Sequence, residues 1–172
     1  MHGWAETESG VAAVRSLKSR AIAALARREH SRQQLSRKLA PHAESEEALE
    51  AVLDELVEKG FLSDTRFAEA LVRVRGERYG AARLAMELRE HGVPQDRSQE
   101  ALESAKATEL ARAQQVWARR FGLPPDTLEA RAKQTRFLIS RGFAPDTLRR
   151  LEANGFAPFE AAPRAHPSTH SG

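Results

Sequence analysis

The sequence predicts an all-α protein made of three tandem three-helix repeats that form an elongated, curved molecule. Three observations predict this fold class. Ala, Leu, Arg and Glu dominate the 172 residues and aromatic residues make up only 6%, a composition that favours helices over strands. Apolar residues recur at spacings of three and four along most of the chain. Residues 87–93 also share a pattern with residues 137–143, fifty positions later, which indicates a repeat.

The first repeat is predicted over residues 14–62. Its first helix, roughly residues 14–28, carries an apolar residue at nearly every turn. Ser31 and Gln34 have the spacing of a capping box, in which both side chains satisfy backbone donors at the start of a helix. That second helix is short, because Pro41 ends it.

The third helix of this repeat has the clearest signals in the chain. Ser45 is a suitable N-cap, and the pair Lys59-Gly60 is a suitable stop. The apolar stripe between them consists of Leu49, Val52, Leu53, Leu56 and Val57.

The second repeat is predicted over residues 63–107. Asp64 is the expected N-cap of its first helix and Gly80 the expected stop. The second helix occupies residues 81–91, and the segment after Gly92 leads into the third. The residues expected to face inward are Phe67, Leu71, Val74, Leu84, Leu88, Ala101, Leu102 and Ala105.

The third repeat is predicted over residues 108–155. Its first helix covers about residues 108–121, and Pro-Asp pairs at 125–126 and 145–146 open the next two helices. The residues expected to face inward are Leu110, Trp117, Phe121, Leu128, Ala132, Ile139, Leu148 and Leu151.

The two ends of the chain have a different composition from the repeats. Residues 1–13 and the Pro-rich residues 156–172 are expected to be disordered, because they offer little apolar surface to bury. Each short repeat is expected to have little interior of its own and to gain stability by packing on its neighbours. Stacking of this kind predicts one continuous concave surface, which suits a long, repetitive partner.

Several kinds of chemistry are excluded or disfavoured by the sequence. The chain has no cysteine, so disulfides and thiolate metal sites are excluded. Phosphate-binding loops, dinucleotide-binding motifs and hydrolase motifs are missing, and the six histidines are scattered. No signal peptide and no stretch of 18 apolar residues is found. We therefore expect a cytoplasmic monomer that is not an enzyme and needs no cofactor or metal.

The distribution of charge is more informative than the net charge of +3. Residues 14–42 carry eight basic residues and one acidic residue, whereas residues 43–71 carry nine acidic and two basic residues. Arginine predominates among the cations, and its guanidinium group binds carboxylates and phosphates with two hydrogen bonds. Tyr79, beside Arg78, is a candidate for stacking on a base. The candidates for contact with a partner or DNA are Arg27, Arg28, Arg32, Lys38, Arg73, Arg78, Arg83, Arg136 and Arg141.

Several short motifs resemble those of a known family. Residues 60–68, Gly-Phe-Leu-Ser-Asp-Thr-Arg-Phe-Ala, resemble the hallmark of the RecX family of bacterial recombination regulators. Residues 24–31 resemble its opening motif, residues 75–84 its second motif and residues 136–143 its third, so the resemblance covers about residues 17–155. Ala43 and Ala81 replace a glycine and a proline that are common in the family.

The resemblance implies tandem three-helix units and a partner, the recombinase RecA in its filament on single-stranded DNA. It implies a mainly inhibitory regulator that limits filament extension, ATPase and strand exchange, with a role in DNA repair and the SOS response. A helical module that binds nucleic acid by itself is the alternative, and steep salt dependence without RecA would identify it. A small enzyme that uses Asp64 or His30 is a third possibility, which requires a concave polar pocket.

Overall fold

The computed structural model describes residues 16–156, and every regular element in this part of the chain is a helix. The first described helix covers residues 16–25. The helices that follow are α2 (Arg32–Leu39), the short 3-10 helix η1 (Ala40–His42), α3 (Glu46–Glu58), α4 (Asp64–Arg75), α5 (Ala81–Glu90), α6 (Gln95–Ala107), α7 (Glu109–Arg120), α8 (Leu128–Ser140) and α9 (Pro145–Ala153).

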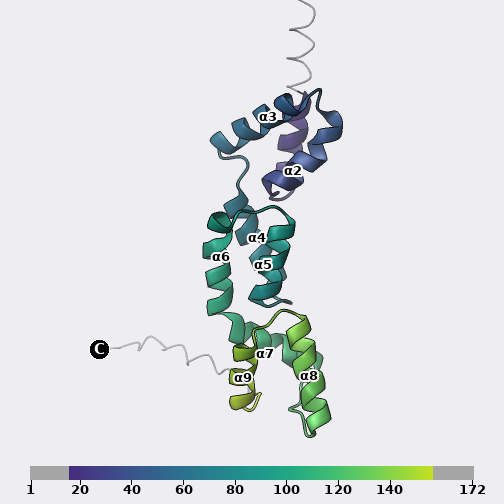
Figure 1. The fold of residues 1–172 in the computed structure, drawn as a ribbon, viewed down its shortest axis with the longest axis vertical. Helices are drawn as coiled ribbons and strands as arrows, with labels where there is room; N and C mark the ends of the chain where they lie inside the picture. The colour runs from purple at the N-terminus through teal and green to yellow at the C-terminus, as the bar shows by residue number, and fades with distance from the viewer. Residues whose placement is uncertain (1–15, 157–172) are drawn as a thin grey trace, which may run out of the picture.

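The helices form three successive groups of three, which lie end to end along the long axis of the molecule (Figure 1). We call them triple 1 (residues 16–62, with α2 and α3), triple 2 (α4 to α6) and triple 3 (α7 to α9). The predicted all-α fold of tandem three-helix repeats in an elongated molecule is confirmed. The predicted bounds of the three repeats, 14–62, 63–107 and 108–155, stay a prediction. Residues 1–13, for which disorder is predicted, lie outside the described residues.

Each triple has a hydrophobic core of its own. Leu35, Leu53 and Leu56 are fully buried in triple 1, and Trp117 and Leu138 are buried in triple 3. Triple 2 encloses two smaller clusters around Phe67 and Leu84. The expectation that a triple has little interior of its own is therefore wrong, because three short helices supply enough Leu and Ala side chains to enclose a core.

Phe156 belongs to the third core, although it was expected to begin the disordered tail. It is buried and its ring lies 5.0 Å from that of Trp117. Gly155, in the left-handed conformation, ends the preceding helix and returns the chain toward the core. The rest of the predicted tail, residues 157–172, lies outside the described residues.

Local signals placed most helix starts correctly, with exceptions at α4 and α8. Helix α8 begins at Leu128 with Thr127 as its N-cap, and not at the Pro-Asp pair 125–126. At α2 the predicted start is correct but the capping box is incomplete. Ser31 accepts a hydrogen bond from the Gln34 backbone, as predicted, but the Gln34 side chain contacts Arg28 and His91 instead of completing a capping box. Ser63 is the N-cap of α4, and Asp64 is its first residue. Because Ser63 already caps α4, the Asp64 carboxylate can accept a hydrogen bond from another helix.

Gly80 and four apolar residues also differ from their predicted roles. Helix α4 ends at Arg75, with Gly76 as its C-cap, so Gly80 begins α5 rather than ending α4. The exposed residues are Val57 at 46%, Val74 at 64%, Leu128 at 84% and Ile139 at 50%. Periodicity shows which side of a helix is apolar, but it does not show how much of that side a neighbouring helix covers.

An ion pair between α4 and α5 makes the stability of triple 2 dependent on pH. Arg75 donates from Nη2 to Glu87 Oε1 at 2.7 Å and from Nε to Oε2 at 3.0 Å. Glu87 is only 7% exposed, and these hydrogen bonds from Arg75 lower its pKa below the ordinary value. Because the folded-state pKa is depressed, the stabilisation is present above about pH 4.5 and is lost as the pH falls through the folded-state pKa.

We expect Glu87→Gln to lower the free energy of unfolding by about 1–2 kcal/mol at pH 7, since it leaves the guanidinium groups of Arg75 and Arg83 with an uncharged, weaker partner. The difference from wild type should shrink as the pH falls from 5 to 3. Urea unfolding followed by circular dichroism over this range measures it. A difference that stays constant with pH would show that the pair does not contribute through charge.

Candidate binding face

The contact between triples 1 and 2 is built from hydrogen bonds at helix ends. The N-terminus of α2 faces the C-terminus of α5, where Ser31 Oγ donates to the carbonyl oxygen of His91 at 2.7 Å. The backbone N–H of Arg32 donates to Asp64 Oδ1 at 2.8 Å. Asp64 thus acts as a cap for a helix in the preceding triple. Gly92 is in the left-handed conformation and lies against Gln33, which leaves no room for a side chain.

The contact between triples 2 and 3 repeats this arrangement. The backbone N–H of Gly80, the N-cap of α5, donates to the carbonyl oxygen of Arg141 at 2.9 Å. The N–H of Ala81 donates to Glu109 Oε1 at 2.7 Å. Gly142 lies against Arg83 and has no room for a side chain. The fifty-residue repeat in the sequence is therefore a repeat of the contact between triples, which holds neighbouring triples in a similar relation.

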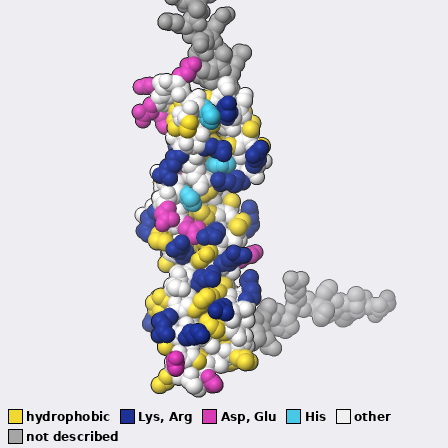
Figure 2. Space-filling view, turned by 90° about the vertical axis from the view of Figure 1, so that its right-hand side faces the viewer, with side chains coloured by type: hydrophobic (Ala, Val, Ile, Leu, Met, Phe, Trp, Pro, Cys, Tyr) yellow, Lys and Arg dark blue, Asp and Glu magenta, His cyan; other side chains and the backbone are white. Residues whose placement is uncertain are grey.

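Basic side chains follow one another along one face from the first triple to the third, together with histidines (Figure 2). Three hollows lie in succession on the molecule. The N-terminal pocket, with a volume of about 500 Å³, lies between the helix of residues 16–25 and the segment from α2 to η1. It is lined by Arg20, Ala23, Ala24, Arg27, Arg28, His30, Lys38, Leu39 and His42.

The middle groove, of about 560 Å³, shares Arg28 with the N-terminal pocket and continues over α4 and α5 to Arg83. Its floor includes the exposed Val74 and part of Phe67, and Glu29, Glu87 and Glu90 contribute negative charge. This groove is therefore mixed in charge, with an apolar floor.

The C-terminal groove, of about 340 Å³, lies between triples 2 and 3 and is lined by Arg78, Arg119, Arg120 and Arg141 with Phe137. The guanidinium of Arg141 lies 5.4 Å from the Tyr79 ring centre and 5.0 Å from that of Phe137. The guanidinium of Arg75 lies 4.5 Å from the Tyr79 ring centre. Tyr79 is already stacked with arginines, so it is not a free platform for a base as the sequence suggested. We call the three hollows together the basic face.

The structure brings most of the predicted contact residues to the basic face. Arg27, Arg28 and Lys38 line the N-terminal pocket, Arg83 lines the middle groove, and Arg78 and Arg141 line the C-terminal groove. Arg73 and Arg136 are exposed outside the hollows.

Arg32, which was also predicted to contact a partner, does not line any of the three hollows. Its Nη2 donates to Glu50 at 2.5 Å and to Asp54 at 2.7 Å, so both acids of α3 neutralise its charge. Burial acts to lower the pKa of Arg32, but the hydrogen bonds to Glu50 and Asp54, together with the charges of these two acids, raise it overall. Arg32 therefore stabilises triple 1, and a partner's carboxylate or phosphate would have to displace Glu50 and Asp54 to bind it.

Four further lining residues were not singled out from the sequence as contacts: Arg20, His42, Arg119 and Arg120. Each of them lies one or two helical turns from a predicted contact residue, or on the opposite side of a pocket from such a residue. Helix packing brings them close to the predicted contacts. Only the basic block at residues 14–42 gave a signal for Arg20 and His42.

The described residues offer little for metal binding or proton transfer. No group of three or more His, Asp or Glu side chains within residues 16–156 is arranged to hold a metal ion. His30 is buried, its Nδ1 pairs with the carbonyl oxygen of Arg28 at 3.0 Å, and burial lowers its pKa. In the same part of the chain, no helix is both long and apolar enough to cross a membrane.

Comparison with known proteins agrees with this architecture. The family model for the second three-helix domain of RecX matches residues 63–102, and the model for the third matches residues 107–151. The crystal structure of RecX from Lactobacillus salivarius superposes with a TM-score of 0.70 over 84% of this chain and 97% of that chain, at 16% sequence identity. A second crystal structure of a regulatory protein RecX gives a TM-score of 0.68 at 19% identity, over 82% of this chain and 73% of that chain.

Relatives of closer sequence carry the same name. The regulatory protein RecX of Leptothrix cholodnii is 50% identical over 136 residues, which cover 79% of this chain and 87% of the relative. The regulatory protein RecX of Ralstonia nicotianae is 52% identical over 136 residues, or 79% of this chain and 86% of the relative. Identity at this level over most of both chains, together with the two matched domains, shows that the chain belongs to the RecX family of regulatory proteins.

Proposed function

We propose that the protein regulates the recombinase RecA by docking along the RecA filament on single-stranded DNA. It acts mainly as an inhibitor, which limits filament extension, ATPase activity and strand exchange, and so acts in DNA repair and the SOS response. The observation that carries the proposal is the basic face, whose hollows succeed one another across three triples that are joined by repeated contacts. Membership of a family of regulatory proteins supports the same role.

The shape of the molecule suits a filament better than a small globular partner. A filament presents the same surface at regular intervals, so each triple of an elongated binder can engage a neighbouring protomer. Linked contacts of this kind raise the overall affinity well above that of any single contact. In this proposal the protein is a cytoplasmic monomer. It regulates RecA by binding the filament with its charged surface and catalyses no reaction.

The unpaired cations of the basic face, together with two exposed arginines outside it, are the proposed contacts. Arg27, Lys38, Arg78 and, outside the hollows, Arg73 and Arg136 make no ion pair with any described residue and remain exposed. Guanidinium groups of this kind bind carboxylates or phosphates without first breaking an internal pair. Arg83 and Arg141 are partly engaged, with Glu87 and with two aromatic rings respectively.

The test is the ATPase activity of RecA on single-stranded DNA with substoichiometric amounts of the protein. We expect wild type to inhibit, and the double reversal Arg78→Glu with Arg119→Glu, at exposed residues of the C-terminal groove, to raise the concentration for half-inhibition at least tenfold. These residues lie in triples 2 and 3, outside the N-terminal pocket, and have no internal partners to lose.

The matched control is Arg89→Glu with Arg150→Glu, which makes the same change of net charge at exposed, unpaired positions of triples 2 and 3 that line none of the three hollows. This control should inhibit like wild type. Absence of inhibition by wild type would reject the proposed function. Equal weakening by both double variants would show that net charge, rather than the basic face, is responsible.

A further inference from the structure

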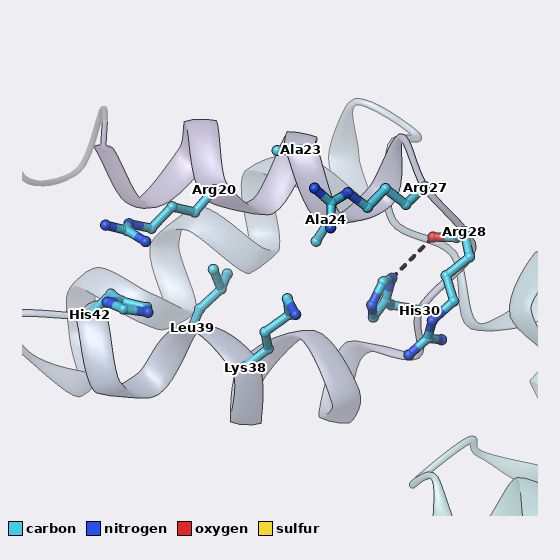
Figure 3. A pocket seen from close by; sticks show the side chains of 9 residues that line it. All are labelled: Arg20, Ala23, Ala24, Arg27, Arg28, His30, Lys38, Leu39 and His42. Atoms are coloured by element: carbon cyan, nitrogen blue, oxygen red, sulfur yellow. Dashed lines mark hydrogen bonds between the residues drawn. The ribbon is translucent and has the colours of Figure 1, made fainter.

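The middle groove is the hollow of the basic face in which charges balance and apolar side chains form the floor. The N-terminal pocket has cations along both walls with small residues between them (Figure 3), and the C-terminal groove has four arginines around Phe137. The middle groove has three arginines and three glutamates, and Ala70, Leu71 and Val74 of α4 contribute to its floor. A phosphate chain would meet three carboxylates here, so the groove suits a protein better than a nucleic acid.

The floor of the middle groove is a helical stripe on α4. Phe67, Ala70, Leu71 and Val74 are spaced by three and four positions, so they share one side of the helix. Phe67 belongs to a core cluster of triple 2 and Leu71 packs against this cluster, whereas Val74 is 64% exposed. The stripe therefore begins in the core and ends at a valine that the described residues leave largely open to solvent.

The matching place in the next triple holds a different kind of side chain. Val74 follows Asp64, the first residue of α4, by ten positions, and Arg119 follows Glu109, the first residue of α7, by the same number. Val74 lines the middle groove and Arg119 lines the C-terminal groove. The fold therefore does not require an apolar residue here, and the two grooves offer different chemistry to a partner.

The charges that line the groove with Val74 indicate what accompanies an apolar side chain there. Arg75 and Arg83 both pair with Glu87, so two guanidinium groups share one carboxylate. One positive charge is left without a counterion in this group. A carboxylate of a partner placed beside the two arginines would bind through charge-assisted hydrogen bonds.

The end of the groove toward triple 1 has no such excess of positive charge. Glu29 pairs there with Arg66, and Arg28 and Glu90 contribute one charge of each sign. A carboxylate of a partner is therefore attracted to the end of the groove formed by Arg75 and Arg83.

From this groove we infer that Val74 is an apolar anchor for a segment of the protein partner in which an aliphatic or aromatic side chain has a neighbouring carboxylate. The apolar side chain packs on Val74 and Ala70, and the carboxylate binds Arg75 or Arg83. The inference rests on the proposed function. It adds that the contact at the middle groove is made with the protein of the filament, and that this contact is mainly apolar.

The test is the inhibition of RecA ATPase by Val74→Asn, which removes the apolar surface and leaves the net charge unchanged. Interface energy is concentrated in a few anchors, and we expect the concentration for half-inhibition to rise about five- to tenfold, as for the lost burial of one partly exposed valine. The increase should be the same at about 50 and about 300 mM NaCl, whereas salt should reduce the effect of Arg78→Glu with Arg119→Glu. Val74→Leu, which stays apolar, should inhibit within about twofold of wild type.

Val57→Asn is the matched control for Val74→Asn. Val57 is the last residue but one of α3, as Val74 is of α4. It is 46% exposed and lines none of the three hollows. We expect this control to inhibit like wild type, and thermal unfolding verifies that both variants keep their fold.

Inhibition by wild type separates the inference from the proposed function. Its absence would reject the proposed function and this inference together. If wild type inhibits, equal inhibition by Val74→Asn and Val57→Asn would overturn the inference alone. A loss for Val74→Asn that disappears at the higher salt concentration would overturn it too, because the contact would then be electrostatic. An equal loss in binding of a fluorescein-labelled oligodeoxythymidine without RecA would assign the groove to nucleic acid instead.

Discussion

Replacing Glu109 with alanine is expected to lower the free energy of unfolding by about 3–4 kcal/mol, because it leaves three donors at the contact between triples 2 and 3 without an acceptor. Glu109 is 5% exposed. Its Oε1 accepts from the Ala81 backbone at 2.7 Å, and its Oε2 accepts from Thr147 Oγ1 at 2.6 Å and from the Ala144 backbone at 3.3 Å.

The position of this carboxylate explains why it is buried without forming an ion pair. Glu109 is the first residue of α7, and its acceptors receive hydrogen bonds from the N-termini of α5 and α9. Three helix N-termini, each with a partial positive charge, therefore converge on one negative group. Arg112, one turn later on α7, supports the same contact by donating to the carbonyl oxygens of Gly76, Tyr79 and Ala105.

Thermal and urea unfolding measure the effect, and the expected loss corresponds to a fall in Tm of roughly 10 °C. The matched control is Glu100→Ala, at an exposed position of α6, which should change Tm by no more than about 2 °C. Equal Tm values for the two variants would contradict the role given to Glu109. Glu109→Gln should fall between them, because an amide oxygen accepts hydrogen bonds but lacks the charge.

The second large effect is expected at Gly80. A Cβ atom placed there would lie 2.2 Å from the carbonyl oxygen of Gly142 and 2.4 Å from the backbone nitrogen of Phe143. Backbone atoms cannot move aside as a flexible side chain does, so Gly80→Ala must separate triple 3 from triple 2. We expect a loss of about 3 kcal/mol, the upper end of the cost of overpacking.

Gly80→Ala should also weaken the inhibition of RecA by more than its effect on folding explains. Separation of the triples changes the spacing between the middle and C-terminal grooves, although no cation is removed. The measurement is half-inhibition of RecA ATPase at 15 °C, where the variant remains folded by circular dichroism. Inhibition equal to that of wild type would show that inhibition does not depend on the spacing between the middle and C-terminal grooves.

Gly60→Ala is the control for Gly80→Ala. Gly60 has φ of +74° and nothing within 4 Å of a Cβ placed there, so its substitution costs only backbone strain of about 1 kcal/mol. Inhibition of RecA by this variant should match that of wild type.

The sequence was sufficient wherever a local signal decides the structure. Ser45 and Gly60 bound α3 as predicted, and the stripe from Leu49 to Leu56 is buried, because an N-cap, a left-handed stop and a helical period act within one helix. The same holds for α9, where Pro145 begins the helix and Leu148 and Leu151 are buried.

Contacts between distant residues could not be predicted in the same way. Asp64 was expected to cap its own helix, yet it accepts from Arg32 in the preceding triple, and Arg66 of the same motif pairs with Glu29. The resemblance identified this motif without showing that it joins two triples. Arg32 was grouped with the other cations, because its pairing with Glu50 depends on how α2 packs on α3.

The repeated contact between triples has a geometric consequence. Ser31 and Gly80, and likewise Asp64 and Glu109, occupy matching places in the two contacts, so each triple meets the next through corresponding points. A chain whose successive units are joined through corresponding points advances by a similar step from each unit to the next. The length of the binding surface therefore increases by one fixed distance with each triple. The addition or removal of one triple would change the number of partner subunits that the protein spans, but not the distance between neighbouring triples.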